Sequence, residues 1–236
     1  MSIPLILLPG TGCNDLLWSK LLPLLAPELH PIAIDLLGLP SIDAMVEKIA
    51  KQPYTTFALL GFSMGGVVAQ EFCARYPERL SHLILMCCTG DGYSAHYAAK
   101  RIDHANYLAS HPDMILSPDY LNGFLHQDSP HFQDARDMSQ HMMKMAGVAK
   151  ICLQMQATAK RNNNYPALEQ LTIPRLVIGA THDRIAVMMQ IEKLAKALHV
   201  EPHFVNSGHM APLENPEAVA AIVNEWFNSI GIIDGQ

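Results

Sequence analysis

The segment Gly-Phe-Ser-Met-Gly at residues 61–65 constrains the fold of this chain more than any other feature. It follows an apolar run at 57–60 that predicts a buried strand, and it precedes a helical pattern at 64–76. A serine between glycines at such a junction is typical of a tight turn, because side chains there would clash with neighbouring backbone. The turn lifts the hydroxyl above the carboxyl edge of a sheet, where a helix N-terminus directs its free N–H groups. We therefore predict that Ser63 is a nucleophile.

Apolar runs and helical patterns alternate along much of the remaining chain. Short buried strands are expected at 3–8, 32–35, 57–60, 83–87, 176–178 and 201–205. Helices are expected at 15–25, 41–50, 64–76, 188–198 and 216–227. Continuous apolar strands that alternate with helices favour an α/β fold, with a mostly parallel central sheet and helices on both faces.

One long segment interrupts this alternation. Residues 90–165 contain no convincing strand, are helical in character and are rich in methionine. We interpret them as a helical cap inserted into the core, and we call residues 90–165 the cap from here on. The core is then expected to comprise residues 1–89 and 166–236.

A histidine and an aspartate follow two of the later strands. His209 lies in the loop Asn-Ser-Gly-His-Met just after the last strand, so it is expected at the same sheet edge as Ser63. A serine hydroxyl needs such a base, and imidazole titrates near neutral pH. Asp183 follows the strand at 176–178 and is predicted to orient the imidazole. The alternative acid is Asp91, which follows the preceding strand.

Two backbone N–H groups are expected to stabilise an oxyanion. A tetrahedral intermediate requires preorganised donors at the position where its negative charge develops. One donor is predicted to be the N–H of Met64, directly after the nucleophile. The second is expected from the loop after the first strand, with Thr11 preferred and Gly12 as the alternative.

Composition excludes several other classes of function. Only 16% of residues are charged, the net charge is −6, and no basic run occurs, which disfavours a nucleic-acid partner. No apolar stretch is long enough to predict a membrane span, and no signal-peptide pattern is present. The five cysteines lack a C-x-x-C motif and indicate reduced core thiols in a cytoplasmic protein. No metal-ligand spacing and no dinucleotide fingerprint occur, so neither a metal nor a cofactor is expected.

Together, these motifs resemble the α/β-hydrolase superfamily, in its capped, lipase- and esterase-like branch. The resemblance spans nearly all of the chain outside the cap, and its motifs lie at 7–12, 35–38, 61–66, 179–183 and 208–216. It implies the α/β-hydrolase fold and a Ser63–His209–Asp183 catalytic triad. Two departures are Pro9, where many relatives have histidine, and a short connection after Asp35.

The expected activity is hydrolysis of a small, largely apolar ester, lactone or thioester through an acyl-enzyme. An apolar pocket is expected to be lined by Trp18, Tyr107, Tyr120, Phe124, Met142 and Met210. Arg101, Arg136 and Arg161 show no spacing that demands an acidic substrate, and we interpret them as solvated. The alternatives are a catalytically silent protein that binds a small ligand, an acyltransferase, and a C–C hydrolase. The sequence does not determine an oligomeric state.

Overall fold

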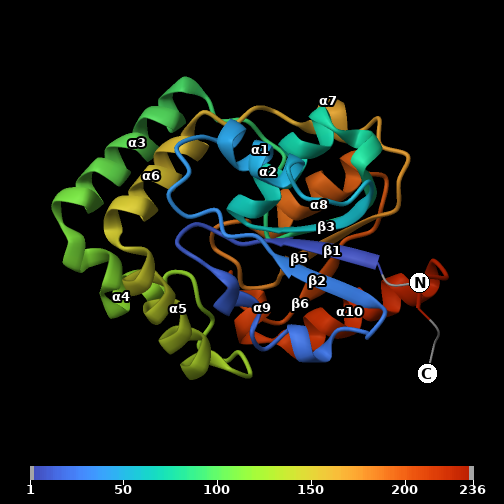
Figure 1. Ribbon diagram of the computed structural model, residues 1–236. Helices are drawn as coiled ribbons and strands as arrows, with labels where there is room; N and C mark the ends of the chain where they lie inside the picture. The colour runs from blue at the N-terminus through green and yellow to red at the C-terminus, as the bar shows by residue number, and fades with distance from the viewer. Residues whose placement is uncertain (1–2, 234–236) are drawn as a thin grey trace.

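Six parallel strands form one sheet through the middle of the molecule (Figure 1). The structure is a computed structural model that describes residues 3–233. The sheet order is β2-β1-β3-β4-β5-β6. The strands are β1 (Ile3–Leu8), β2 (Leu29–Ala33), β3 (Phe57–Phe62), β4 (Leu80–Met86), β5 (Arg175–Ala180) and β6 (His203–Val205). Because every pair is parallel, the carboxyl ends of all six strands lie at one edge.

Helices cover both faces of this sheet. One face packs against α1 (Ile42–Ala50), α2 (Met64–Arg75), α7 (Tyr165–Leu168) and α8 (Met188–Ala197). The other face packs against α9 (Ala211–Glu214), α10 (Pro216–Ser229) and two short 3₁₀ turns, Asp15–Trp18 and Leu22–Leu24. Each layer buries its own apolar cluster against the strands, which is the arrangement that continuous apolar strands require.

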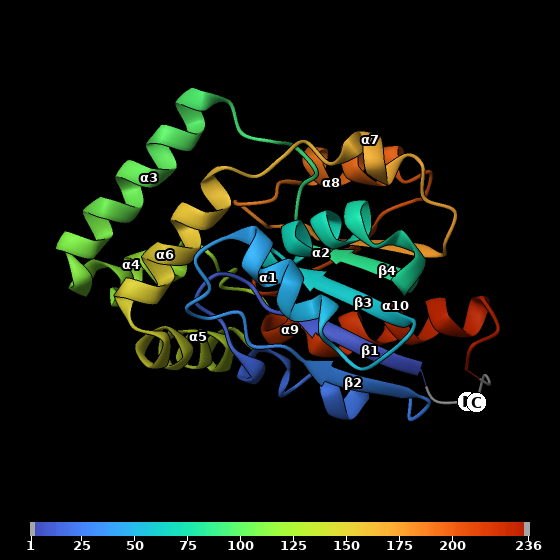
Figure 2. The same cartoon turned by 45° about the horizontal axis from the view of Figure 1, so that its top comes forward.

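The segment between β4 and β5 is helical. It contains α3 (Ala95–Ser110), a 3₁₀ turn (Pro112–Leu116), α4 (Pro118–Asn122), α5 (Phe132–Ala146) and α6 (Val148–Ala159). These helices lie beyond the carboxyl ends of the strands, as Figure 2 shows. They enclose a small apolar cluster of their own, which includes Leu108, Ile115 and Ile151. The division of the chain into core and cap remains a prediction.

Two of the elements that differ from the sequence expectation contain a proline. The second strand runs over Leu29–Ala33 rather than 32–35, and it includes Pro31. It is the edge strand of the sheet, where a residue without an N–H is tolerated. The helix expected at 15–25 is instead two 3₁₀ turns, and Pro23 lies in the second, where its ring disfavours a continuous α-helix. Within residues 3–233, no helix has the length and apolarity needed to cross a membrane.

Candidate active site

The turn that carries Ser63 is strained and tightly enclosed. Ser63 has φ 52° and ψ −114°, a left-handed conformation that is rare for a residue with a side chain. A Cβ atom on Gly61 would lie 2.5 Å from the carbonyl oxygen of Gly65. A Cβ atom on Gly65 would lie 2.1 Å from the carbonyl oxygen of Leu8. The expectation that only glycine fits on both sides of Ser63 is therefore confirmed.

Ser63, His209 and Asp183 form a continuous hydrogen-bonded chain. The Ser63 Oγ lies 2.9 Å from His209 Nε2, and His209 Nδ1 lies 2.7 Å from Asp183 Oδ2. The side chain of His209 is 6% exposed and that of Asp183 is fully buried. Asp183 Oδ1 also accepts hydrogen bonds from the N–H groups of Ile185 and Ala186, at 2.7 and 3.0 Å. A carboxylate held in this way keeps the proton on Nδ1, so Nε2 can accept the serine proton.

The sheet register brings the loop after β1 next to Ser63. Leu8 at the end of β1 pairs with Gly61 at the end of β3, although the two residues are far apart in sequence. The position between β1 and β3 is also where the strand order reverses, and ligands of open α/β sheets bind at such points. The loop at 9–13 and the turn at 61–65 therefore face the same space.

Two N–H groups in this space are free to bind an oxyanion. Among residues 3–233, the N–H groups of Thr11 and Met64 have no hydrogen-bond acceptor. The N–H of Gly12 instead donates to Gln154 Oε1 at 2.8 Å, so the alternative donor is already occupied. Thr11 and Met64 line a cavity together with Ser63.

The partners of Asp91 are residues other than His209. Its carboxylate forms an ion pair with Lys193 and accepts a hydrogen bond from the Tyr165 hydroxyl at 3.2 Å. The only acid that contacts His209 in the part of the chain described is Asp183. The geometry thus favours Asp183 over Asp91 as the acid.

A buried carboxylate holds the loop that carries the histidine. Glu214 is fully buried, and its oxygens accept hydrogen bonds from the N–H groups of Gly208 and Met210 at 3.0 and 2.9 Å. It also accepts from the N–H of His126 in the cap at 2.8 Å. The residues before and after His209 are thereby fixed by one side chain. Sequence patterns alone do not single out Glu214, although it lies within the motif at 208–216.

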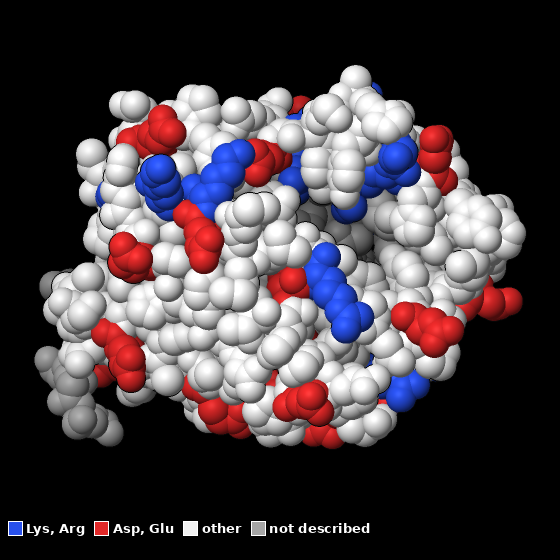
Figure 3. Space-filling model, turned by 180° about the vertical axis from the view of Figure 1, so that it is seen from behind, with Lys and Arg blue, Asp and Glu red and all other residues white. Residues whose placement is uncertain are grey.

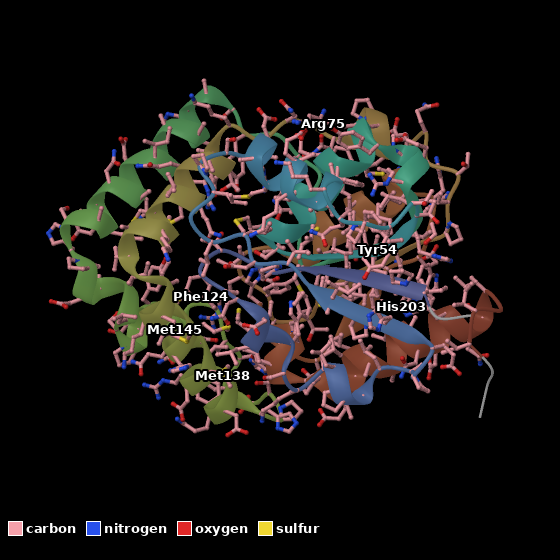
Figure 4. The ribbon with its side chains drawn as sticks, viewed as in Figure 1. Tyr54, Arg75, Phe124, Met138, Met145 and His203 are labelled. Carbon is pink, nitrogen blue, oxygen red and sulfur yellow. The ribbon has the colours of Figure 1, made fainter. Side chains whose placement is uncertain are left out.

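An apolar cavity of about 490 Å³ opens beside Ser63 and His209. Tyr120, Phe124 and Met210 line it as expected, together with Met143 and Met155. Figure 4 labels Phe124 in the cap, whereas His203 lies on the core, far from it. The cavity is enclosed by cap helices on one side and strand ends on the other, so it suits a small apolar group.

The structure corrects three other expected pocket residues. Trp18 is fully buried and packs edge-on against Phe62, whose ring in turn lies 5.2 Å from that of His209. Met142 is buried in the apolar cluster of the core, because neighbouring positions on a helix point in different directions and the cavity receives Met143 instead. Tyr107 is 47% exposed and stacks on His111.

A second cavity, of about 430 Å³, shares Ser63 with the apolar one. Arg101 and Arg161 both line it, and the buried Nε atom of each corrects their interpretation as solvated side chains; Arg136 lines neither cavity. Figure 3 shows a hollow where the cap meets the core, with lysine and arginine side chains gathered near its rim.

This fold and this arrangement of serine, histidine and aspartate define an α/β-hydrolase class of protein. The chain belongs to the alpha/beta hydrolase family, whose model matches residues 5–222. The chain is 23% identical to human monoacylglycerol lipase ABHD6 over 261 aligned positions, covering 98% of this chain and 77% of the lipase. It is 33% identical to pimeloyl-[acyl-carrier protein] methyl ester esterase of Legionella pneumophila over 87 residues, which cover 35% of this chain and 36% of the esterase.

A solved structure confirms the fold. A thermophilic esterase from Thermogutta terrifontis, in a malate-bound structure, matches with a TM-score of 0.86 at 21% identity. The match covers 98% of this chain and 91% of the esterase. The relatives include a lipase and esterases, which supports a hydrolase activity for this chain.

Proposed function

We propose that this protein is a serine hydrolase that cleaves a small, largely apolar ester, lactone or thioester. The observation that carries the proposal is the hydrogen-bonded chain from Ser63 through His209 to Asp183, at the floor of an apolar cavity. The relationship to ester hydrolases supports the same reaction class.

The proposed reaction proceeds in two halves through an acyl-enzyme. Ser63 Oγ attacks the carbonyl carbon while His209 Nε2 takes the hydroxyl proton, and Asp183 stabilises the imidazolium that forms. The N–H groups of Thr11 and Met64 donate to the oxyanion, and one such donor contributes about 10²–10³-fold to kcat. His209 then protonates the leaving group. In the second half, His209 activates water, which releases the acid and restores Ser63.

The strained turn contributes to the proposed catalysis because it holds Ser63 in one position. Serine could relax from its left-handed conformation only if the turn moved, and the close packing of Gly61 and Gly65 prevents that. The hydroxyl therefore stays within reach of both His209 and the two N–H donors. Such preorganisation avoids the loss of entropy that positioning a flexible nucleophile would require in every turnover.

The test is hydrolysis of p-nitrophenyl esters of increasing acyl length by the wild type and by Ser63→Ala. We expect the substitution to reduce kcat by more than about 10⁴-fold, because the nucleophile is lost. Ser139→Ala is the matched control, since Ser139 lines the same cavity but donates only to the carbonyl of Ala135. The acyl length that gives the highest kcat/KM indicates the length of acyl chain that the pocket accommodates.

Other outcomes separate the alternatives. Equal turnover by the wild type and Ser63→Ala, or no turnover of any ester, lactone or thioester, contradicts the proposal. Ligand binding without turnover would then favour a catalytically silent protein. Ester products formed with added alcohols, in preference to acids, would identify an acyltransferase. Cleavage confined to C–C substrates would identify a C–C hydrolase.

A further inference from the structure

Two arginines of the cap face the second cavity from different elements. Arg101 is on α3 and Arg161 follows α6, and both line the cavity that contains Ser63. Arg101 Nη2 donates to Thr158 Oγ1 at 3.2 Å, and Arg161 Nη2 donates to Thr89 Oγ1 at 2.8 Å. The Nε atom of each arginine is buried and has no hydrogen-bond partner. Each guanidinium is thus held by one hydrogen bond from Nη2 and keeps further N–H donors without an acceptor in the described part of the chain.

No carboxylate of the described residues contacts either arginine directly. Within residues 3–233, neither Arg101 nor Arg161 forms an ion pair. The acidic side chain in the cavity lining is Asp91, and its carboxylate is already engaged by Lys193 and Tyr165. Two partly buried positive charges without an acid are unfavourable unless an anion offsets them.

Stacking holds the second guanidinium in a fixed plane. The Arg161 guanidinium lies 3.8 Å from the centre of the Tyr93 ring, and that of Arg101 lies 5.9 Å from it. Burial is the largest influence and lowers the pKa of Arg161; the nearby Arg101 charge also lowers it, whereas Tyr93, Cys88 and Asp91 oppose the shift. The net lowering is the direction expected for a buried cation that forms no ion pair. A fixed planar guanidinium with free N–H donors matches the two oxygens of a carboxylate.

We propose that this cavity binds a carboxylate of the substrate, held by Arg101 and Arg161, so that the ester or thioester carries an acidic end. The inference rests on the proposed serine hydrolase function. Ser63, Thr11 and Arg101 line both cavities, so the reacting carbonyl lies where the two meet. The apolar part of the substrate occupies the cavity next to Phe124, and its anionic end occupies the cavity next to Arg161.

The experiment compares pairs of esters in which one member carries a carboxylate and the other does not. On the acyl side, p-nitrophenyl half-esters of succinic, glutaric and adipic acid are compared with butyrate, valerate and hexanoate. On the alcohol side, 4-carboxyphenyl butyrate is compared with phenyl butyrate. For the wild type, we expect kcat/KM of the acidic ester to exceed that of its neutral partner by about tenfold or more in at least one pair. The pair in which the acidic ester is preferred shows whether the carboxylate belongs to the acyl part or to the alcohol part of the substrate.

Variants assign the preference to the two arginines. In Arg101→Gln and in Arg161→Gln, we expect the ratio of acidic to neutral kcat/KM to fall by about tenfold or more. Arg136→Gln is the matched control, because Arg136 is also a cap arginine but lines neither cavity. If Arg161→Gln does not fold, Arg101→Gln and Arg161→Lys provide the test, since lysine keeps the charge and loses the planar fork.

Two results would overturn the inference. One is a wild-type ratio near or below one in every pair. The other is a preference that the variants of Arg101 and Arg161 leave unchanged. Failure of the proposed function is distinguishable, because the wild type would then hydrolyse neither the acidic nor the neutral ester of any pair in a Ser63-dependent way. In that case, calorimetry with glutarate tests the carboxylate site directly. Binding that is weakened in both Arg101→Gln and Arg161→Gln supports the site, and any other result rejects it.

Discussion

The buried side chain of Gln154, on α6, accepts a hydrogen bond from the N–H of Gly12 at 2.8 Å. Its Nε2 donates to the carbonyl oxygen of Leu36 at 3.1 Å, so one cap residue joins two loops of the core. Gly12 directly follows Thr11, the proposed oxyanion donor. Gln154 therefore couples the position of the cap to the shape of the oxyanion loop.

Replacement of Gln154 by methionine is expected to lower both stability and kcat. The buried N–H of Gly12 and carbonyl of Leu36 lose their partners, and each unsatisfied group costs about 1–3 kcal/mol. We expect kcat to fall because the loop no longer holds Thr11 in place. Urea unfolding and kcat with a p-nitrophenyl ester measure the two effects.

Gln156→Met is the control for that variant. Gln156 lies on the same helix, and its side chain donates to Asn106 near the surface rather than to the core. We expect this variant to keep the wild-type kcat. A Gln154→Met enzyme with unchanged kcat would show that the cap does not position the oxyanion loop.

Glu214→Gln is expected to impair the loop that carries the histidine. The glutamate oxygens accept from the N–H groups of Gly208, Met210 and His126, and an amide can replace only one of the two oxygens as acceptor. The variant should therefore lose about 1–3 kcal/mol of stability, measured by thermal or urea unfolding. It should also lose kcat, because the imidazole is held less firmly.

The exposed Glu225, on α10, provides the matched control for Glu214. Glu225→Gln makes the same chemical change at the surface, where we expect a stability change within about 0.5 kcal/mol. Equal stability of the two variants would mean that the three N–H groups find other acceptors.

Asp183→Asn distinguishes the two candidate acids. An amide in place of the carboxylate favours the wrong imidazole tautomer, so we expect kcat to fall by about 10⁴-fold with little change in folding. Asp91→Asn, tested on the same neutral ester, is expected to keep most of the wild-type kcat, because Asp91 contacts Lys193 and Tyr165 rather than His209. The reverse order of the two effects would assign the acid to Asp91.

The thiols are expected to resist alkylation in the folded protein. All five cysteines are free and buried. Burial raises the pKa of Cys13, Cys73 and Cys88 to about 12, so the reactive thiolate is scarce at pH 8. Iodoacetamide labelling, followed by mass spectrometry, should modify none of these three within minutes in buffer and all of them in urea. Rapid labelling of Cys88 without urea would show that the second cavity opens far enough to activate it.

Local sequence patterns determined the elements that carry the chemistry. The segment at 61–65 predicted the tight turn because its glycine requirement is a short-range steric effect, and Gly61 and Gly65 do contact backbone in the structure. The alternation of apolar runs and helices predicted the parallel sheet, which in turn implies that Ser63, Asp183 and His209 lie at one edge. Each of these inferences depends on neighbours within a few residues or on a general rule of sheet topology.

Only the tertiary structure decided what each cap side chain faces. Met142 and Met143 are adjacent residues of the same type, so the sequence does not distinguish them. Only the packing of α5 against the core places Met142 in the apolar core and Met143 in the cavity. Arg101 and Arg161 are sixty positions apart in sequence, and the pairing of the cap helices brings them to one cavity next to Ser63. Contacts between distant segments depend on the packing of whole helices, which no short stretch of sequence encodes. The substrate preference that we infer from those arginines follows from that packing, whereas the proposed nucleophile follows from five consecutive residues.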